Sequence, residues 1–454
     1  MNTRSLSLAT LIATLSRALD LTEGEPLGHA IRSCWIGMQL GEALSLGEDE
    51  RHELFYALLL KDAGCSANSH QVSEWFGTDD RSAKYELKSV NWSRLSHAVR
   101  YAVAQTKPGA PWRERLTAIA NIARRGPQAA RTLVEMRCTR GADLVRELGW
   151  VSLAPDAVLN LDEHWDGSGQ PRGLRGHEIP LLGRILSLAQ TVEMFWSRFG
   201  PEAARDVARS RRGSWFDPEL VDAWLSMSAD DTLFTQLAAL NLPHQIASYD
   251  PKPRSLPWDD HAVLLPIAQV FADIVDTKSS WTASHSWRTA HYAKSLTEIL
   301  GEPPALQEAA LLAGLFHDLG KLGVSNLILD KPGPLSPAER AAIETHPQMT
   351  YTLLEPLVPL HMIAEGAAAH HERLDGTGYY RHLKGPHIPY LGQIVAVADV
   401  HDALAHARPY RRALSTEDVL AIMRSDRTTK LSPDVFDALE WGLLNQPERF
   451  VPTA

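Results

Sequence analysis

The stretch LFHDLGKLG, residues 315–323, places a histidine and an aspartate side by side at the end of an apolar run. An imidazole and a carboxylate are typical metal ligands, and they stand where a helix of the core should end. Lys321 lies four residues after His317, so one helical turn would bring its ammonium group near the same place. Gly320 would let the helix end there. The stretch predicts helices that deliver ligands to a metal site.

Further candidate ligands follow in the second half of the chain. They are imidazoles and carboxylates without a thiol, a mixture that suits Fe, Mn, Zn or Ni better than Cu(I) or an iron–sulfur cluster. An aspartate directly after a histidine can bridge two metals, and metals about 3.5–4 Å apart can assist attack on a phosphoryl group. The other histidines, such as His291 and His361, are expected to be structural or surface residues. The candidate ligands are His285, His317, Asp318, His346, His370, His371 and Asp399.

Most of the chain has the composition and periodicity of helices. Residues 303–320, for example, are rich in Ala, Leu and Glu, and their apolar residues recur every three or four positions. Ser336, Pro337 and Glu339 predict a helix that starts with a capping box, and Ser415 predicts another helix start. Alternating strand patterns are scarce. The predicted fold class is all-α.

The two halves of the chain are related to each other. Three blocks match in the same order, which indicates a duplicated domain. Between the halves, residues 241–260 contain four prolines, a density that predicts a linker. We therefore predict domains at 1–240 and 261–454, two tandem helical bundles. The matches are Leu8 with Leu264, Asp20 with Asp276, His29 with His285 and Asp62 with Asp318 at an offset of 256, residues 165–189 with 374–398 at 209, and 216–224 with 431–439 at 215.

Bulk composition narrows the class of protein. The chain has 454 residues, of which 44% are hydrophobic and 22% charged, and its net charge of −10 argues against non-specific nucleic-acid binding. Cys34, Cys65 and Cys138 are too few and scattered for a disulfide framework, so a reducing cytoplasm is expected. No run approaches the roughly 18 apolar residues of a membrane span, and no membrane partner is expected. The apolar N-terminus resembles a signal peptide, but it matches 264–276 and is predicted as a domain's first helix.

The second half resembles the HD-GYP phosphohydrolases, a branch of the HD superfamily. The resemblance covers about residues 264–440 and rests on HDLGKLGVSNLILDKPGPLSPAE, THP, HHERLDGTGYY, VAVADVHDAL and ARPYRRA, in that order. It implies an all-helical domain that binds two or three metals, usually iron or manganese. It also implies hydrolysis of cyclic di-GMP, a bacterial second messenger, to a linear dinucleotide or GMP.

The resemblance implies roles for individual residues. The seven candidate ligands would bind the metals, Asp318 and Lys321 would be catalytic, and Lys321 would contact the scissile phosphate. Arginines suit phosphate binding because their fork reaches two oxygens, although those of RPYRR could equally lie on a solvated helix face. The implied substrate-binding residues are Lys321, Gly378, Tyr379, Arg408 and Arg411.

Two departures from the family pattern affect these expectations. Some members use a glutamate four residues before the first histidine to bind a third metal, and Trp281 stands there instead. Because tryptophan cannot bind metal, we expect two divalent ions, iron or manganese. The loop normally ends Gly-Tyr-Pro, and here Tyr380 replaces the proline, which removes a fixed backbone angle but no ligand.

The first half retains little of the site. His29 and Asp62 remain, but the counterparts of the other ligands are changed, and Lys61 would place a positive charge where a cation should bind. We therefore predict no dinuclear site there and expect a scaffold or regulatory domain that keeps its turns at 166–169 and Pro171. An insertion of 47 residues between Asp62 and Asp166 has no predicted role. The substitutions are Lys61 for His317, Cys65 for Lys321, Leu161 and Asp162 for His370 and His371, and Gln190 for Asp399.

The predicted function is metal-dependent hydrolysis of a cyclic dinucleotide, with cyclic di-GMP the first choice. One alternative is an inactive protein that senses a nucleotide or docks a partner such as a diguanylate cyclase. Another is an HD phosphohydrolase with a different nucleotide substrate, because ligands set the chemistry while pocket walls set the substrate. A homodimer stays open, and DNA binding is not expected because no helix-turn-helix is recognised.

Overall fold

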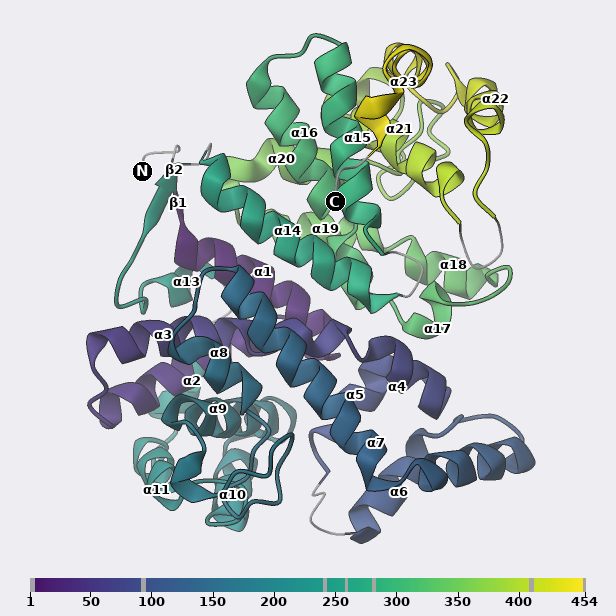
Figure 1. Ribbon diagram of the computed structural model, residues 1–454. Helices are drawn as coiled ribbons and strands as arrows, with labels where there is room; N and C mark the ends of the chain where they lie inside the picture. Colours follow the sequence, from purple (N-terminus) through teal and green to yellow (C-terminus); the bar gives the residue numbers. More distant parts are fainter. Residues whose placement is uncertain are drawn as a thin grey trace. The chain divides into compact units, whose positions relative to one another are not determined.

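The protein is described here by a computed structural model, which covers residues 5–90, 95–239, 243–257, 260–279, 283–407 and 412–451. Helices dominate these residues, and the strands among them are two three-residue segments that pair with each other, β1 (Ser5–Ser7) and β2 (Ser255–Pro257) (Figure 1). The predicted all-α class is therefore confirmed. Of the helices in the described ranges, none combines the length and apolar character that a bilayer crossing requires.

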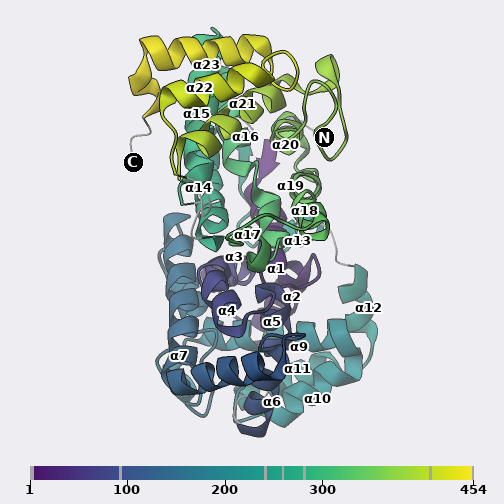
Figure 2. The ribbon, with the colours of Figure 1, turned by 90° about the vertical axis from the view of Figure 1, so that its right-hand side faces the viewer.

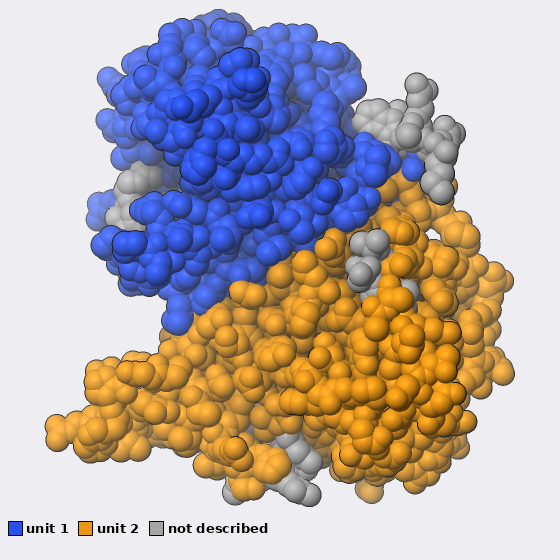
Figure 3. All heavy atoms as spheres, turned by 180° about the vertical axis from the view of Figure 1, so that it is seen from behind, with its two compact units in different colours: residues 1–5, 256–454 blue, residues 6–255 orange. Residues whose placement is uncertain are grey.

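The chain forms two compact units, coloured separately in Figure 3. Residues 6–255 make the N-terminal unit, and residues 256–454 with 1–5 make the C-terminal unit. The stretch predicted as a linker, 241–260, includes a short helix, α13 (Pro243–Ala247), and the strand β2. Pro243 fits the start of α13 because the first helical position needs no backbone N–H donor.

The N-terminal unit is built around α1, whose side chains are buried on nearly every face. The apolar segment that resembles a signal peptide is thus a core helix, packed against α2 and α3. The helices of the unit are α1 (Leu8–Thr22), α2 (His29–Ala43), α3 (Glu48–Leu60), η1 (Ala63–Ser66), α4 (Ser69–Phe76), α5 (Asp80–Leu87), α6 (Leu95–Gln105), α7 (Trp112–Glu147), α8 (Leu153–Leu159), η2 (Gly176–Glu178), α9 (Leu181–Phe199), α10 (Pro201–Arg211), α11 (Pro218–Met227), α12 (Thr232–Ala239) and α13.

The C-terminal unit packs α15 against α16 and α21, and α20 against α16, α19 and α21. Figure 2 shows α22 and α23 side by side in this unit. Its helices are α14 (His261–Lys278), α15 (His285–Ile299), α16 (Pro304–Phe316), η3 (Leu319–Gly323), α17 (Asn326–Leu329), α18 (Pro337–Ile343), α19 (His346–Leu354), η4 (Val358–Leu360), α20 (His361–Ala368), η5 (Gly385–His387), α21 (Tyr390–Ala405), α22 (Thr416–Asp426), α23 (Pro433–Asn445) and η6 (Pro447–Phe450).

The helix boundaries of the two units follow the offsets found in the sequence. Helices α2 and α15 both have 15 residues and start 256 positions apart. Helices α9 and α21 start 209 apart, and α10 and α11 precede α22 and α23 by 215. Before α2 and α15, Asp20 and Asp276 accept backbone N–H groups from the first turn of each helix. The two units therefore share one order of helices.

The predicted helix starts are confirmed. Pro337 begins α18, the Ser336 hydroxyl accepts the Glu339 N–H at 3.3 Å, and the Glu339 carboxylate accepts the Ser336 N–H at 2.7 Å. The Ser415 hydroxyl accepts the Asp418 N–H at 3.2 Å, at the start of α22. Short side chains at these positions satisfy N–H groups that have no partner inside the helix.

The segment that contains the insertion, between Gly64 and Arg137, holds α4, α5, α6 and the first part of α7. Gly64 approaches the backbone of α7 so closely that an added Cβ would lie 1.9 Å from the Arg137 carbonyl oxygen. Gly320 approaches the His346 carbonyl oxygen in the same way, at 2.1 Å. Arg137 and His346 are 209 residues apart, which is the offset of the second matching block. The two halves therefore correspond again from Arg137 onward, and the extra residues lie between Gly64 and Arg137.

Candidate metal centre

The candidate ligands come from five separate segments, and the structure brings all seven together. His285 is the first residue of α15, His317 and Asp318 follow α16, and His346 is the first residue of α19. His370 and His371 follow α20, and Asp399 lies in α21. Except for His371, which is partly exposed, these residues are buried.

Asp318 lies at the centre of the cluster. Its Oδ2 atom is 3.3 Å from His317 Nε2 and 3.5 Å from His285 Nε2. Its Oδ1 atom is 3.3 Å from His346 Nε2 and 3.8 Å from His370 Nε2. The two oxygens therefore face different pairs of histidines, as the oxygens of a carboxylate that bridges two cations would.

Asp399 belongs to the same cluster. Its Oδ1 atom lies 3.3 Å from His285 Nε2, and its Oδ2 atom lies 4.0 Å from His371 Nδ1. Ligand atoms gather in three overlapping groups, each within 4.8 Å: His346, His370 and His371; His285, His317 and Asp399; and His317, Asp318 and His370. The donor set has room for two positions that share Asp318.

Three histidines are oriented by backbone carbonyls at the ends of helices. His317 Nδ1 donates to the Gly314 carbonyl at 2.6 Å, and His370 Nδ1 donates to the Ala367 carbonyl at 2.6 Å. His346 Nδ1 donates in the same way, at 2.7 Å, to the carbonyl three residues earlier. The last carbonyls of a helix have no partner inside it, so they are free to accept these bonds. Because a carbonyl only accepts, each ring must carry its proton on Nδ1 and present the Nε2 lone pair to the cluster.

Asp402 orients the fourth histidine, and the sequence reasoning missed it. His285 Nδ1 donates to Asp402 Oδ2 at 2.6 Å, and Arg288 Nε donates to Asp402 Oδ1 at 2.6 Å. Asp402 is fully buried. A carboxylate behind a ligand histidine fixes its ring and raises its basicity. A signal existed in the sequence, because Glu193 stands at the matching position of the first half, 209 residues earlier.

The two carboxylates of the cluster are held in their ionised form. Burial alone would raise the pKa of Asp318, but His317 and Lys321 act against it and hold that pKa well below its usual range. Burial would also raise the pKa of Asp399, but the bond from His285 holds it well below its usual range. Ionised carboxylates are the form that binds a cation.

Burial lowers the pKa of His346 to about 4 and holds the pKa values of His370 and His371 well below their usual range. These imidazoles are therefore neutral, as metal ligands must be. His285 differs, because three carboxylates overcome its burial and raise its pKa well above the usual range. A cation among the same carboxylates would take the place of that proton.

The buried atoms of the cluster fit a cation. His317 Nε2 and Asp318 Oδ1 are buried, and neither has a hydrogen-bond partner in the described part of the chain. Unpaired buried acceptors are costly, and a metal ion satisfies them without a donor. The residues present thus suit divalent Fe, Mn, Zn or Ni with N and O ligands.

Lys321 lies beside Asp318, at the partly exposed side of the cluster. Its Nζ donates to Asp318 Oδ2, and 17% of the side chain is exposed. Gly320 does not end the preceding helix, contrary to expectation, because α16 stops at Phe316 and η3 follows. Gly320 is needed instead for the close approach of η3 to the His346 carbonyl.

The loop residues line one side of the cluster. The Tyr379 ring lies 4.7 Å from the His371 ring, centroid to centroid, and its N–H donates to the His371 carbonyl at 3.3 Å. Gly378 packs on the backbone of His371–Arg373, where an added Cβ would meet the His371 carbonyl oxygen at 2.4 Å. Tyr380 follows a cis peptide bond, as Pro171 does at the matching position of the first half. Three expectations, for Trp281, Arg408 and Arg411, lie outside the described residues.

The matching place in the N-terminal unit is filled by the protein's own cations. Lys61 Nζ lies 3.1 Å from His29 Nε2 and forms an ion pair with Asp62. Arg137, which occupies the position of His346, forms an ion pair with Asp162. Sequence reasoning named Lys61 but missed Arg137. Subtracting the offset of 209 from the position of His346 gives Arg137, so the sequence could have identified it.

Other titratable side chains around the N-terminal counterpart of the site also form pairs within the protein. His29 Nδ1 pairs with Glu193, and Lys88 Nζ lies 3.0 Å from a Glu23 oxygen. Glu23, Asp62 and Cys65 are close enough to hold an ion. Burial, however, raises the pKa of the Cys65 thiol well above its usual range. Burial would also raise the pKa of Asp62, but the neighbouring Lys61 holds that pKa below the usual value of an aspartate. Ammonium and guanidinium groups thus stand where the other unit has its candidate metal ligands.

Comparisons with known proteins agree with the repeat. The HD domain family matches residues 81–220 and 269–435. A Vibrio cholerae protein named 3′3′-cGAMP-specific phosphodiesterase 3 is 41% identical over 447 residues, which cover 98% of this chain and 96% of that protein. A solved V. cholerae structure, of a cyclic GMP-AMP specific phosphodiesterase, is 37% identical, covers 98% of this chain and 99% of its own, and superposes with a TM-score of 0.68.

A second kind of relative matches only one part of the chain. A Xanthomonas campestris pv. campestris protein named cyclic di-GMP phosphodiesterase response regulator RpfG is 35% identical over 173 residues. The match covers 38% of this chain and 46% of that protein.

Proposed function

The chain belongs to the HD-domain family of metal-dependent phosphohydrolases, in its HD-GYP branch, and on this basis we propose that it hydrolyses a cyclic dinucleotide. We propose further that 3′3′-cGAMP, rather than cyclic di-GMP, is its preferred substrate. The observation that carries the reaction is the convergence of four Nε2 atoms on one ionised carboxylate, Asp318.

The extent of similarity favours 3′3′-cGAMP. A relative named for 3′3′-cGAMP matches 98% of this chain, whereas another named for 3′3′-cGAMP matches 37% of it and the relative named for cyclic di-GMP matches 38%. Because substrate choice depends on the walls of a site rather than on its ligands, similarity over both units is the better guide. The sequence alone favoured cyclic di-GMP as the substrate, and we now propose 3′3′-cGAMP in its place.

The chain's own residues would prepare the reaction as follows. The seven ligands would hold two divalent cations, iron or manganese, which would supply Lewis acidity toward a phosphoryl oxygen and toward the attacking water. Asp402 and the carbonyls of Gly314, Ile343 and Ala367 fix the imidazoles in place. Water would attack the phosphorus of one phosphodiester, the P–O bond to the ribose would break, a proton would pass to the departing ribose oxygen, and the product would be a linear dinucleotide.

Lys321 would bind the phosphate. Its ammonium group lies at the partly exposed side of the cluster, beside the carboxylate that both cations would share. A positive charge there attracts the phosphate oxygens and stabilises the charge that develops on them during attack. The Tyr379 ring, packed against His371, would form an aromatic wall next to the substrate.

The complete ligand set favours an enzyme over a non-catalytic sensor. The sensor alternative rests on Trp281, on Tyr380 and on the altered first half. None of these removes one of the seven ligands. The cations that fill the N-terminal site are instead consistent with a unit that regulates or supports the other and performs no turnover of its own.

Turnover by the anaerobically purified protein tests the proposal. We would load Mn(II) or Fe(II), add 3′3′-cGAMP or cyclic di-GMP, and resolve the nucleotides by chromatography. We expect linear product from both and a kcat/KM about tenfold or more higher for 3′3′-cGAMP, the ratio that about 1.4 kcal/mol of transition-state preference gives. His317→Ala should abolish turnover, whereas His361→Ala, at an exposed histidine outside the cluster, should retain it.

The possible failures are distinguishable. If neither nucleotide is hydrolysed although the protein binds metal, the phosphodiesterase proposal fails and the sensor alternative takes its place. If cyclic di-GMP is hydrolysed as well as or better than 3′3′-cGAMP, the reaction stands and the substrate proposal fails.

A further inference from the structure

The insertion of the first half forms a helical hairpin that takes no part in the metal centre. We call residues 95–125, which are α6 and the part of α7 before Gly126, the insertion hairpin. Gly126 interrupts α7 with φ 65° and ψ −171°, a backbone conformation that glycine adopts without a steric penalty. In a chain of net charge −10, the hairpin has one acidic residue, Glu114, and six basic residues: Arg100, Lys107, Arg113, Arg115, Arg124 and Arg125.

The first part of α7 has an apolar stripe that faces solvent. Trp112, Leu116, Ile119 and Ala123 are spaced by four, three and four residues, so they lie on one face of the helix. Trp112 is 66% exposed and Leu116 is 55% exposed. In a globular protein such a stripe normally packs on the core. Its exposure indicates a surface that contacts something other than this chain's core.

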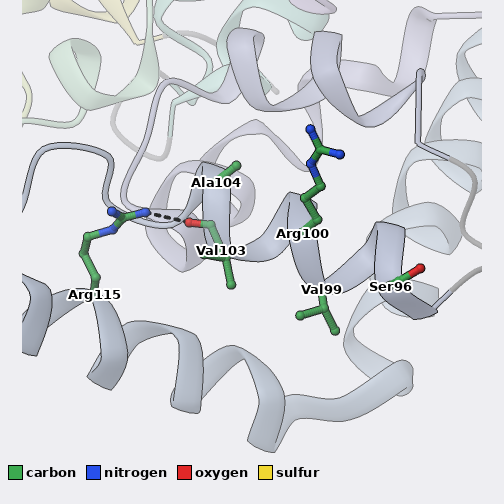
Figure 4. Close-up of a pocket in the computed structure, with 6 residues that line it drawn as sticks. All are labelled: Ser96, Val99, Arg100, Val103, Ala104 and Arg115. Carbon is green, nitrogen blue, oxygen red and sulfur yellow. Dashed lines mark hydrogen bonds between the residues drawn. The ribbon is translucent and has the colours of Figure 1, made fainter.

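An apolar hollow of about 740 Å³ lies next to the stripe, between α6 and α7 (Figure 4). Val99 and Val103 point from α6 toward the first turns of α7, yet they are 53% and 43% exposed. Arg115 links the two helices by donating to the Val103 carbonyl at 2.7 Å. The helices therefore stay apart and leave an open apolar groove, lined by Ser96, Val99, Arg100, Val103, Ala104 and Arg115.

Among the residues that the structure describes, the cations of the hairpin have no acidic partners. Within the described residues, none of the six basic side chains forms an ion pair. The Arg113 guanidinium lies 5.4 Å from the centre of the Trp112 ring, and Arg124 donates to the Asn121 side chain at 3.1 Å. Arg113 and Arg124 each come directly after a residue of the stripe, so they lie along its edge on the helix. Their positive charge is therefore close to any surface that contacts the stripe.

We propose that the insertion hairpin is an interfacial element that binds an anionic lipid bilayer. Helices that lie in a bilayer surface combine an apolar face, often with tryptophan, and a basic polar face. Trp112 and Leu116 enter the boundary between headgroups and acyl chains, and the arginines meet lipid phosphates. Acyl chains adapt to an open groove, whereas a protein partner must match its shape. That no described helix could cross a membrane does not bear on this contact, because an interfacial helix lies along the surface.

Sedimentation with vesicles tests the proposal. The full-length protein is mixed with vesicles of phosphatidylcholine alone or with about one-third phosphatidylglycerol, and the bound fraction is measured at low and high salt. We expect binding to anionic vesicles at least about fivefold above neutral ones, and weaker binding at high salt, because each basic residue adds attraction that salt screens. Trp112→Ser with Leu116→Ser should remove most binding, and so should Arg113→Glu with Arg124→Glu.

Matched variants separate the hairpin from general surface effects. Trp441→Ser with Leu444→Ser changes an exposed tryptophan and leucine of α23, 47% and 65% exposed, and should leave vesicle binding unchanged. Arg172→Glu with Arg175→Glu makes the same charge change on a loop and should reduce binding less than twofold. All four variants should retain hydrolase activity, because they lie outside the metal centre.

Three results would overturn the proposal. One is no binding of the wild-type protein to anionic vesicles. Another is an equal loss of binding in the α23 variant and the Trp112 variant. The third is a dimer, seen by analytical ultracentrifugation, that the Trp112 variant disrupts while vesicles bind neither protein, which would make the stripe a contact between two copies of the chain.

Discussion

In the candidate metal centre, single hydrogen bonds fix the orientation of four imidazoles. His317, His346 and His370 each donate to a carbonyl three residues earlier, at the end of a helix. This geometry explains why HDLGKLG places its ligands where a helix stops, since only there are carbonyls free. Residue types and spacing were enough to predict which side chains gather in the cluster, but the bonds depend on where each helix ends. His285 is not at a helix end of this kind and relies on Asp402.

Replacement of Asp402 by asparagine should weaken metal binding. The buried carboxylate holds His285 and carries the charge that balances Arg288. Loss of such a supporting carboxylate lowers metal affinity by about 10–100-fold. We expect the metal concentration that gives half-maximal activity to rise by that factor, with activity recovering at high metal. Asp437→Asn, at an exposed carboxylate paired with Arg427, should not shift it; an unshifted midpoint in Asp402→Asn would show that the carboxylate has no positioning role.

Replacement of Lys61 by methionine should destabilise the N-terminal unit. The side chain of Lys61 is fully buried between His29 and Asp62, so the variant leaves a buried carboxylate without its cation. Breaking a buried pair in this way costs about 3–5 kcal/mol. Thermal unfolding followed by circular dichroism measures the loss. Lys252→Met removes an exposed pair with Asp49, which water screens, and should lower the stability far less, so similar losses in the two variants would contradict the argument.

Among the elements, those that begin with a cap could be predicted, and those shaped by contact between backbones could not. Ser336 and Ser415 start α18 and α22 as expected. The expected helix end at Gly320 is wrong, because α16 stops at Phe316 and Gly320 lies in η3. A cap is local in sequence, whereas the approach of η3 to α19 joins segments that are separated in the chain by α17 and α18. A sequence shows the glycine but not the backbone that it must accommodate.

Gly320→Ala should disable the metal centre through the packing of η3 on α19. The added Cβ would lie 2.1 Å from the His346 carbonyl oxygen and 2.9 Å from the Thr350 nitrogen, and neither backbone atom can rotate away. A shift of α19 by about 1 Å would displace His346 and lower kcat by about 100-fold. Activity and bound metal would be measured together, with circular dichroism to verify folding.

Gly333→Ala is the matched control for this substitution. A Cβ at Gly333 meets nothing within 4 Å, so its kcat should stay close to that of the wild-type protein. A folded Gly320→Ala variant with normal metal content and activity would mean that the two elements do not need this contact.

At the scale of the whole molecule, the duplication could be predicted from the sequence. The changes at the N-terminal counterpart of the site could be predicted only in part. Three blocks at fixed offsets predicted two related halves, and the helix boundaries follow those offsets. Lys61 indicated that the first half binds no metal pair. The insertion hid the counterpart of His346, since the offset changes from 256 to 209 between Gly64 and Arg137. The packing of Gly64 on α7 and of Gly320 on α19 shows that the offset is already 209 at Arg137, so Arg137 occupies that position.

Metal should therefore stabilise one unit and leave the other unaffected. A ligand present at 100 times its Kd adds about 2.7 kcal/mol to the free energy of opening the structure that binds it. Hydrogen exchange should thus slow by up to about 100-fold when Mn(II) replaces a chelator, in peptides from 285–404. Peptides from 29–62 and 137–193 should exchange at the same rate in both conditions, because Lys61 and Arg137 already neutralise the carboxylates there. His317→Ala should abolish the effect in 285–404, and slowing of the N-terminal peptides by Mn(II) would mean that this unit binds metal after all.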